Sequence, residues 1–146
     1  MDDIEQLLTD FNRVKAACQE MEQKKILVGL ISDKVDSDVM IIAHAHEYGV
    51  PGKLPERSFI RKSFDTGQDE LGEIVTGALT KMLARQISPD AAANSIGAQA
   101  TQLVQSFIDE NKVKPESDFK RKTQYTTLYE TGTHIRGRLA YEVVSG

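Results

Sequence analysis

The segment AHAHEYGVPGKLPERSFIR, residues 43–61, is the stretch of this chain from which the rest can be organised. An apolar run ends at Tyr48, a new amphipathic segment begins at Arg57, and two prolines and two glycines lie between them. Proline fixes φ and removes a backbone donor, whereas glycine permits positive φ. The sequence therefore predicts a turn-rich Pro/Gly loop at about 49–57, held at its two ends while its middle stays free.

Before this segment, the pattern predicts a helix and then a strand. Residues 2–22 carry apolar side chains three and four positions apart, the spacing of one helix face: Ile4, Leu7, Leu8, Phe11, Val14, Cys18 and Met21. Because Cys18 lies on that stripe, we expect a small buried side chain rather than a reactive thiol. Residues 25–32 are short and rich in aliphatic and β-branched side chains, and they predict a buried strand.

A helix over about residues 39–48 leads into the loop, with Ser37 or Asp38 as its N-terminal cap. After the loop, a short helix is expected near Phe59 to Phe64, and apolar spacing of three and four predicts a longer one over 71–86.

Ser88 and Pro89 are a cap and a first-turn proline, and they begin a helix that runs to about Glu110. Gly97 in its middle is expected to let another backbone approach. Residues 138–144 alternate and predict a closing strand.

Helices in the middle of the chain and strands near both ends predict an α+β fold, with several helices packed on a small, mainly antiparallel sheet. With 146 residues the chain is expected to form a single domain, 1–146. We expect one helical turn at 117–122 and no clear period over 126–133.

Composition and charge argue against several classes of protein. The net charge of -4 does not suit a surface built for nucleic acid. A single cysteine cannot form an internal disulfide, which fits a reducing cytoplasm. The N-terminal residues are acidic where a signal peptide would be basic, and no apolar run approaches the length of a membrane span. We therefore expect a protein that folds in the cytoplasm and has no membrane partner.

Metal-dependent hydrolysis is one alternative function, with His44, His46 and Glu47 at the site and His134 as a distant candidate ligand. On a helix, His44 and His46 point about 200° apart and cannot share one ion. No second pair of ligands follows at zinc spacing. We therefore expect histidines that are partly exposed beside the loop, and neither a metal nor a cofactor.

Nucleic-acid binding through the basic stretch Lys112 to Lys122 is a second alternative. Glu116 and Asp118 interrupt the run of positive charge, which favours an ordinary solvated face. Enzymatic motifs are also missing, since no Gly-x-Ser-x-Gly pattern surrounds Ser58. The carboxylates of Glu47, Glu56 and Glu130 are expected to be solvated or paired with one of the arginines Arg57, Arg61 and Arg136.

Two blocks of the sequence carry a resemblance to a known family. In the first, Ala43-x-x-x-Glu47-Tyr48-Gly49 leads to Pro55-x-Arg57-Ser58-Phe59-Ile60-Arg61; in the second, Leu128-x-x-Thr131-Gly132 precedes the last strand. In this order the blocks resemble the tail-completion or neck proteins of long-tailed bacteriophages, which overlap the phage virion morphogenesis and minor tail component families. The resemblance implies an α+β structural protein of virion assembly at the head–tail junction. It further implies location in the host cytoplasm and then the virion, with no catalysis and no cofactor.

The resemblance also implies partners, namely phage tail or connector proteins, and self-association into a ring such as a hexamer. Aromatic side chains and arginines are the usual anchors of protein interfaces, and they gather around 48–61. The residues expected to bind partners, there and around 126–138, are Glu47, Tyr48, Lys53, Arg57, Phe59, Arg61, Thr131, His134 and Arg136. For Phe59 a second interpretation stays open, in which the ring seals the core where two helices meet.

Overall fold

The computed structural model describes residues 2–31, 33–110, 112–115 and 135–146. Its elements follow in the order α1 (Asp3–Glu22), β1 (Lys24–Gly29), α2 (Ser37–Tyr48), α3 (Arg61–Thr66), α4 (Gln68–Leu83), α5 (Pro89–Asp109), α7 (Ile135–Arg138) and β2 (Ala140–Ser145). A mostly helical chain with a two-stranded antiparallel sheet confirms the predicted α+β class. The expected turn at 117–122 and the aperiodic segment at 126–133 lie outside the described residues.

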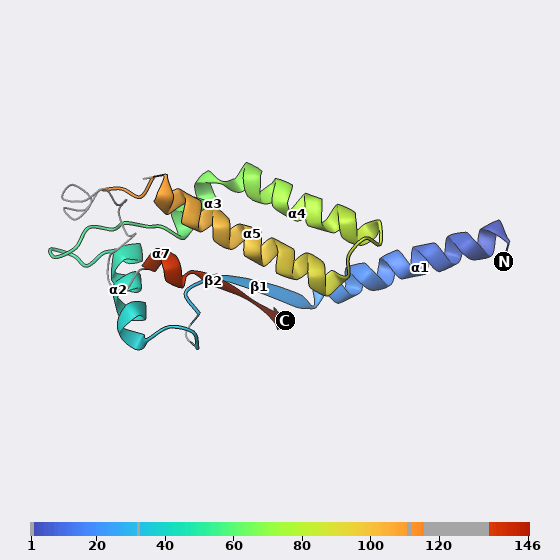
Figure 1. Ribbon diagram of the computed structural model, residues 1–146, viewed down its shortest axis with the longest axis horizontal. Helices are drawn as coiled ribbons and strands as arrows, with labels where there is room; N and C mark the ends of the chain where they lie inside the picture. The colour runs from blue at the N-terminus through green and yellow to red at the C-terminus, as the bar shows by residue number, and fades with distance from the viewer. Residues whose placement is uncertain (1, 32, 111, 116–134) are drawn as a thin grey trace.

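The sheet joins the two ends of the chain. β1 and β2 pair antiparallel, from Lys24 opposite Ser145 to Gly29 opposite Ala140. The closing strand begins later than its alternating pattern predicted, because Arg138 belongs to α7. The pairing places α7 at one end of the sheet and leaves α1 to run outward from the other end (Figure 1).

Helix α5 is the centre of the packing and lies between α4 and the sheet (Figure 1). It begins as predicted, because the Ser88 hydroxyl accepts a hydrogen bond from the Ala91 N–H at 3.0 Å and Pro89 stands in the first turn. Its buried residues occupy most of its length: Ala92, Ala93, Ile96, Gly97, Ala100, Thr101, Leu103, Val104, Phe107 and Ile108. One apolar cluster forms around Val104 and Ile108, and a second forms around Ile96 against α4.

Gly97 permits a close approach, but the approaching group is not the backbone that the sequence suggested. The ring of Tyr141 from β2 lies against Gly97, and a Cβ at this position would overlap that ring. The Tyr141 hydroxyl donates to the Asn94 side chain at 3.1 Å. A helix with little side-chain bulk therefore accommodates an aromatic side chain from the sheet.

Helix α1 is present as predicted, but the prediction that Cys18 is a small buried side chain on its apolar stripe is wrong. Its N-terminus is capped by Asp2, whose carboxylate accepts from the Glu5 N–H at 2.8 Å. No residue of α1 is buried, Cys18 is exposed, and four stripe residues are between 57% and 70% exposed: Ile4, Leu7, Leu8 and Phe11. The reason is that α1 projects beyond the body (Figure 1), so only Ala17 and Met21 near its C-terminal end reach an apolar cluster.

Helix α2 covers the predicted range and begins slightly earlier. Its N-terminal cap is Asp36 rather than Ser37 or Asp38, and the cap makes no side-chain hydrogen bond. No helix in the described part of the chain is both long enough and apolar enough to cross a membrane.

Candidate partner-binding site

The carboxylate of Glu47 is the polar centre of the segment that the sequence singled out. Glu47 lies in the last turn of α2 and is buried. Its Oε2 accepts hydrogen bonds from the N–H groups of Phe59 at 2.7 Å and Ile60 at 3.1 Å. Its Oε1 accepts from the Ser58 hydroxyl at 3.0 Å and from both the N–H and the Nε of Arg61, at 2.9 Å and 3.1 Å. One side chain thus fixes residues 58–61 against α2.

These bonds satisfy backbone donors where α3 begins. The first N–H groups of a helix have no partner within the helix, and a negative charge is favourable there. Burial alone would raise the pKa of Glu47, but the hydrogen bonds from Arg61, Ile60 and Phe59 outweigh it and lower that pKa below its ordinary value. Glu47 is therefore ionised at neutral pH and acts as a cap supplied by another helix.

The guanidinium of Arg61 joins both ends of the loop. Its Nη2 donates to the backbone oxygen of Glu47 at 2.6 Å and to the carboxylate of Glu56 at 3.0 Å. Its Cζ also lies 4.4 Å from the centroid of the Tyr48 ring, which is a cation–π contact. Arg61 keeps part of its surface in solvent, so it belongs to the exposed face as well as to the internal network.

Between these ends, the backbone forms a loop that is closed by hydrogen bonds of its own. Val50 and Leu54 exchange two hydrogen bonds, at 2.8 Å and 2.9 Å, around a turn in which Gly52 has φ of 75°. At the base, Gly49 has φ of 76°, and a Cβ there would meet the backbone of Glu56. A turn-rich loop is present where it was predicted, and both glycines have the positive φ for which the residue is suited. Its middle is not free as expected, because the Val50–Leu54 pair closes it.

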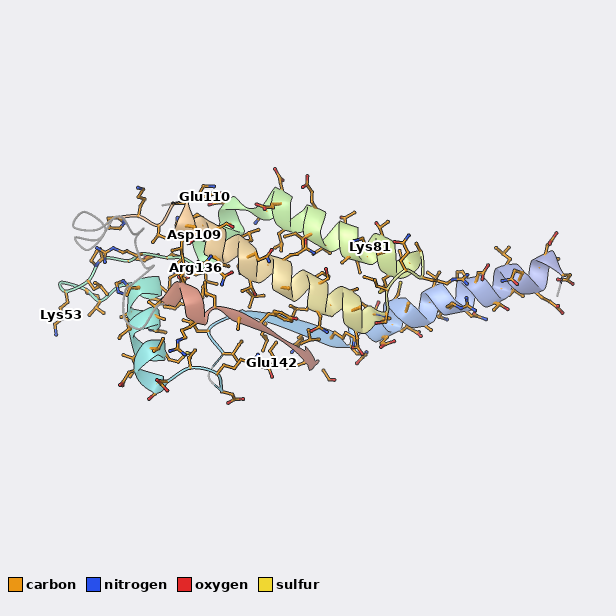
Figure 2. The ribbon with its side chains drawn as sticks, viewed as in Figure 1. Lys53, Lys81, Asp109, Glu110, Arg136 and Glu142 are labelled. Atoms are coloured by element: carbon orange, nitrogen blue, oxygen red, sulfur yellow. The ribbon has the colours of Figure 1, made fainter. Side chains whose placement is uncertain are left out.

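The exposed surface of this region combines a ring pair with a lysine. Tyr48 is 54% exposed, and its ring centroid lies 4.7 Å from that of His44. Lys53 stands at the tip of the loop, at the end of the molecule opposite α1 (Figure 2). Tyr48, Lys53 and Arg61 are therefore the predicted partner-binding residues of this segment that reach solvent.

Three other predicted residues serve the interior and need correction. Phe59 is fully buried in the cluster with Val104 and Ile108, which favours the alternative that it seals the core. Glu47 is buried in the network described above. Arg57 is also buried; its Nε donates to the backbone oxygen of Pro115 at 2.7 Å, and burial lowers its pKa. These side chains hold the loop in place and do not present themselves to a partner.

The second predicted segment is only partly described. Arg136 of α7 makes a two-pronged ion pair with Asp109 at the end of α5, with Nε–Oδ1 of 3.0 Å and Nη2–Oδ2 of 2.7 Å (Figure 2). This pair attaches α7 to α5 and occupies a guanidinium that was expected to bind a partner. Thr131 and His134 lie outside the described residues.

The two histidines of α2 lie apart, as expected for this spacing on a helix. The prediction that both are partly exposed is wrong for His46. His44 is exposed, whereas His46 is buried and its Nδ1 has no hydrogen-bond partner among the described residues. Burial, with a smaller effect from the positive charge of Arg57, lowers the pKa of His46. Within residues 2–31, 33–110, 112–115 and 135–146, no group of three or more histidine, cysteine or acidic side chains is placed to hold a metal ion.

Sequence reasoning missed the Glu47 network, although a signal for it was present. Glu47 and Arg61 stand on opposite sides of the loop, and their opposite charges are compatible with the ion pair that the structure shows. The bonds to three consecutive N–H groups could not be read from composition or periodicity. Of the basic stretch, Lys112 is paired with Glu110 at 2.7 Å, and most of the remainder lies outside the described residues.

Comparisons of this chain with models of protein families, with curated proteins and with solved structures find no match.

Proposed function

We propose that this protein is a structural component of a bacteriophage or prophage that completes the tail or the head–tail junction by docking on other virion proteins. The resemblance of the two sequence blocks supports this proposal. The observation that carries it is an exposed loop whose two ends are fixed by the buried Glu47 carboxylate.

A pinned loop suits docking for an energetic reason. Association has to overcome the conformational entropy lost when the contacting segment becomes ordered. Here Glu47 and Arg61 hold the base, and the Val50–Leu54 pair holds the turn, before any partner arrives. The loss on binding is therefore smaller than for a free loop of the same length.

The exposed groups indicate what the partner offers. Tyr48 provides a half-exposed ring beside a guanidinium, and Lys53 provides an unburied positive charge at the tip. We propose an acidic partner surface on a tail or connector subunit, with the segment around 126–138 as a second contact. The proposed role needs neither catalysis nor a cofactor, and it includes self-association into a ring.

Removal of the loop tests the proposal directly. Because Gly49 approaches the backbone of Glu56, residues 50–55 can be deleted and the ends joined by a short glycine linker. We expect cooperative unfolding close to that of the intact protein, and no head-to-tail joining when the variant replaces the intact gene in the phage. Normal virions from a folded deletion variant would contradict docking through this loop.

A matched pair of lysine substitutions sharpens the test. Lys53 and Lys81 are both exposed but lie on different parts of the molecule (Figure 2). We expect Lys53→Glu to weaken binding to purified connector or tail subunits about tenfold or more, and Lys81→Glu to leave it unchanged. Equal effects of both changes would mean that only net charge matters.

A further inference from the structure

The two-stranded sheet gives each strand one edge that no other described strand covers. In an antiparallel ladder, residues alternately bond to the partner strand and point their backbone groups away from it. The Gly146 N–H donates to the Gln23 oxygen at 2.6 Å in the register that joins β1 and β2, which fixes this alternation. The odd-numbered residues of β1 therefore bond to β2. The even-numbered ones point their N–H and C=O groups to the outer edge of β1, and they are Lys24, Ile26 and Val28.

The backbone groups of Ile26 and Val28 have no hydrogen-bond partner among the described residues. Both residues are half-buried, and their side chains pack against the apolar clusters beneath the sheet. A backbone donor or acceptor that loses water without gaining a partner is costly. The outer edge of β1 therefore requires either water or another extended chain.

The outer edge of β2 differs from that of β1. There the Lys34 Nζ donates to the backbone oxygen of Tyr141 at 3.3 Å, which agrees with the alternation and occupies that edge. A lysine at a sheet edge discourages the addition of another strand. The hollow beside β2 also has polar side chains in its lining, among them Asn94, Gln102 and Gln105. Of the two edges, that of β1 is the one suited to receive a strand.

A groove beside β1 provides the space for that strand. It has a volume of about 740 Å³ and is mainly apolar. It is bordered by β1 and by Leu71 and Val75 of α4, and the buried residues Ile96 and Ala100 of α5 also line it. The side chains of a strand point alternately to its two faces. Every second side chain of a strand added to β1 would therefore meet the apolar groups of α4 and α5.

We propose that the β1 edge, defined as the backbone of residues 24–28 together with this groove, accepts an extended segment of a partner protein as a third strand. In this mode of recognition, main-chain hydrogen bonds provide affinity and alternate side chains provide specificity. The inference deepens the proposed function and rests on it for the identity of the partner, a tail or connector subunit. It adds a second contact to the one through the 49–57 loop.

The backbone geometry selects a lone extended segment as the occupant. Donors and acceptors that recur at every second residue match another extended chain, whereas a helix bonds its backbone groups internally. The described sheet of a second copy does not supply this strand. Its own β1 edge lies in the same groove beside α4, and Lys34 occupies its β2 edge. An extended arm or terminus of another protein has neither obstruction.

The lining of the groove indicates the composition of this segment. The side chains that face α4 and α5 are expected to be apolar. Those between them are expected to be neutral or basic, because the charged residues that line the groove, Asp33 and Glu142, are both acidic. Lys25 is exposed at the start of β1, so an acidic side chain is favourable only at that end.

Amide hydrogen exchange of the isolated full chain, followed by NMR, tests whether the edge is open. The Leu27 N–H bonds to β2, whereas those of Ile26 and Val28 point outward. We expect the two outward amides to exchange at least about tenfold faster than that of Leu27. Equal protection of all three would overturn the inference, because the edge would already be covered.

A synthetic peptide tests strand addition without a phage protein. The probe is acetyl-Thr-Val-Lys-Val-Thr-Val-Thr-amide, in which apolar side chains alternate with neutral or basic ones. At about 1 mM peptide, we expect saturable protection of the Ile26 and Val28 amides. The same peptide with proline in place of the central valine should have no such effect. Absence of protection with the first peptide, or equal protection with both, would overturn the inference.

A matched pair of proline variants identifies the edge that binds. Val28→Pro removes an outward N–H from β1, and Val143→Pro removes one from β2, while the bonds between the strands remain. We expect Val28→Pro to weaken peptide binding about tenfold or more, and Val143→Pro to leave it within about twofold. Equal weakening in two folded variants would overturn binding at β1.

A second pair changes the groove and leaves the strands intact. Leu71→Glu places a charge on the α4 side of the groove, and Leu83→Glu changes an exposed apolar position of α4 outside it. We expect only Leu71→Glu to weaken peptide binding. Unchanged binding by Leu71→Glu would overturn the placement of the strand between β1 and α4.

The exchange measurement repeated with purified tail or connector subunits separates this inference from the proposed function. Protection of the Ile26 and Val28 amides in the complex would support strand addition by the partner. A complex that forms without this protection would overturn the inference and leave docking through the 49–57 loop intact. Absence of any complex would count against the proposed function, and the peptide titration would then decide whether the β1 edge accepts a strand.

Discussion

Apolar side chains are buried at one end of this molecule and exposed at the other. At the junction of α2 and α3, Phe59 is 0% exposed, and the Glu47 carboxylate beside it is hydrogen-bonded within the chain. At the other end, Phe11 of α1 is 64% exposed on a helix with no buried residue. The junction is complete in one copy of the chain, whereas α1 has surface left to cover.

The difference arises because the two ends provide different numbers of packing partners for their apolar side chains. The junction folds a loop and a short helix back onto α5, so that Phe59 meets Val104 and Ile108. Helix α1 extends past the body and has only a terminal turn of packing there. The apolar period of α1 is clear although its face is exposed, which shows that amphipathic spacing identifies a face but does not say which molecule covers it.

The largest expected contrast is between the two phenylalanines themselves. We expect Phe59→Ala to reduce the free energy of unfolding by about 3–5 kcal/mol, because it leaves a cavity in the core. Phe11→Ala should change it by less than about 0.5 kcal/mol in dilute protein, where copies are separate. Urea denaturation followed by circular dichroism measures both. Similar losses would mean that α1 packs within the single chain.

The next contrast concerns two glutamates at the base of the loop. Glu47→Gln removes the negative charge to which three N–H groups and the Arg61 guanidinium donate. We expect it to lower the free energy of unfolding by about 3 kcal/mol. Glu56 binds the same guanidinium at the surface, so Glu56→Gln should change stability by less than about 1 kcal/mol. If the two changes were equal in urea denaturation, the buried carboxylate would not be what fixes the junction.

Acid should weaken the junction in two stages. The lowered pKa of His46 means that the unfolded chain binds more protons as the pH falls through the ordinary value of 6.5, so stability decreases. The lowered pKa of Glu47 adds a second loss, which begins as the pH falls through 4.5.

A matched pair of histidine variants isolates the first stage. Thermal melting points recorded between about pH 8 and pH 5 should decline in the intact protein and decline less in His46→Leu. His44→Leu, changed at an exposed position of the same helix, should keep the decline. If the decline of the melting point with pH disappeared only in His44→Leu, the effect would come from His44 and not from His46. We expect this change to be smaller than that of Glu47→Gln.

The smallest effect is expected at the ion pair that ties α1 to the loop after α4. Arg85 donates to the Asp10 carboxylate at 2.6 Å, but both side chains are partly exposed to solvent. We therefore expect Arg85→Ala to lower stability by less than about 1 kcal/mol and to be masked by high salt. Lys81→Ala is the control for loss of a nearby charge. Urea denaturation with and without salt measures the effect. A decrease of more than about 2 kcal/mol in the free energy of unfolding would show that α1 is held to the body more firmly than its exposure suggests.

Most of the elements could be predicted from the sequence, and the candidate site only in part. The Ser88 cap, the long apolar periods and the Pro/Gly loop act through neighbours in the chain, so local chemistry was enough to find them. The exposure of individual site residues could not be found this way. Tyr48 and Phe59 are both aromatic residues beside the loop, yet one faces solvent and the other faces α5.

By itself, the sequence determined the α+β class, the approximate helices and strands, and the position of the 49–57 loop, because these depend on propensity and on contacts within a few residues. Only the tertiary structure decided that Glu47 caps α3, that His46 and Arg57 are buried, and that the apolar face of α1 is exposed. These features depend on which distant segments meet and on where the body ends. A pattern of spacing along one segment carries no information about either.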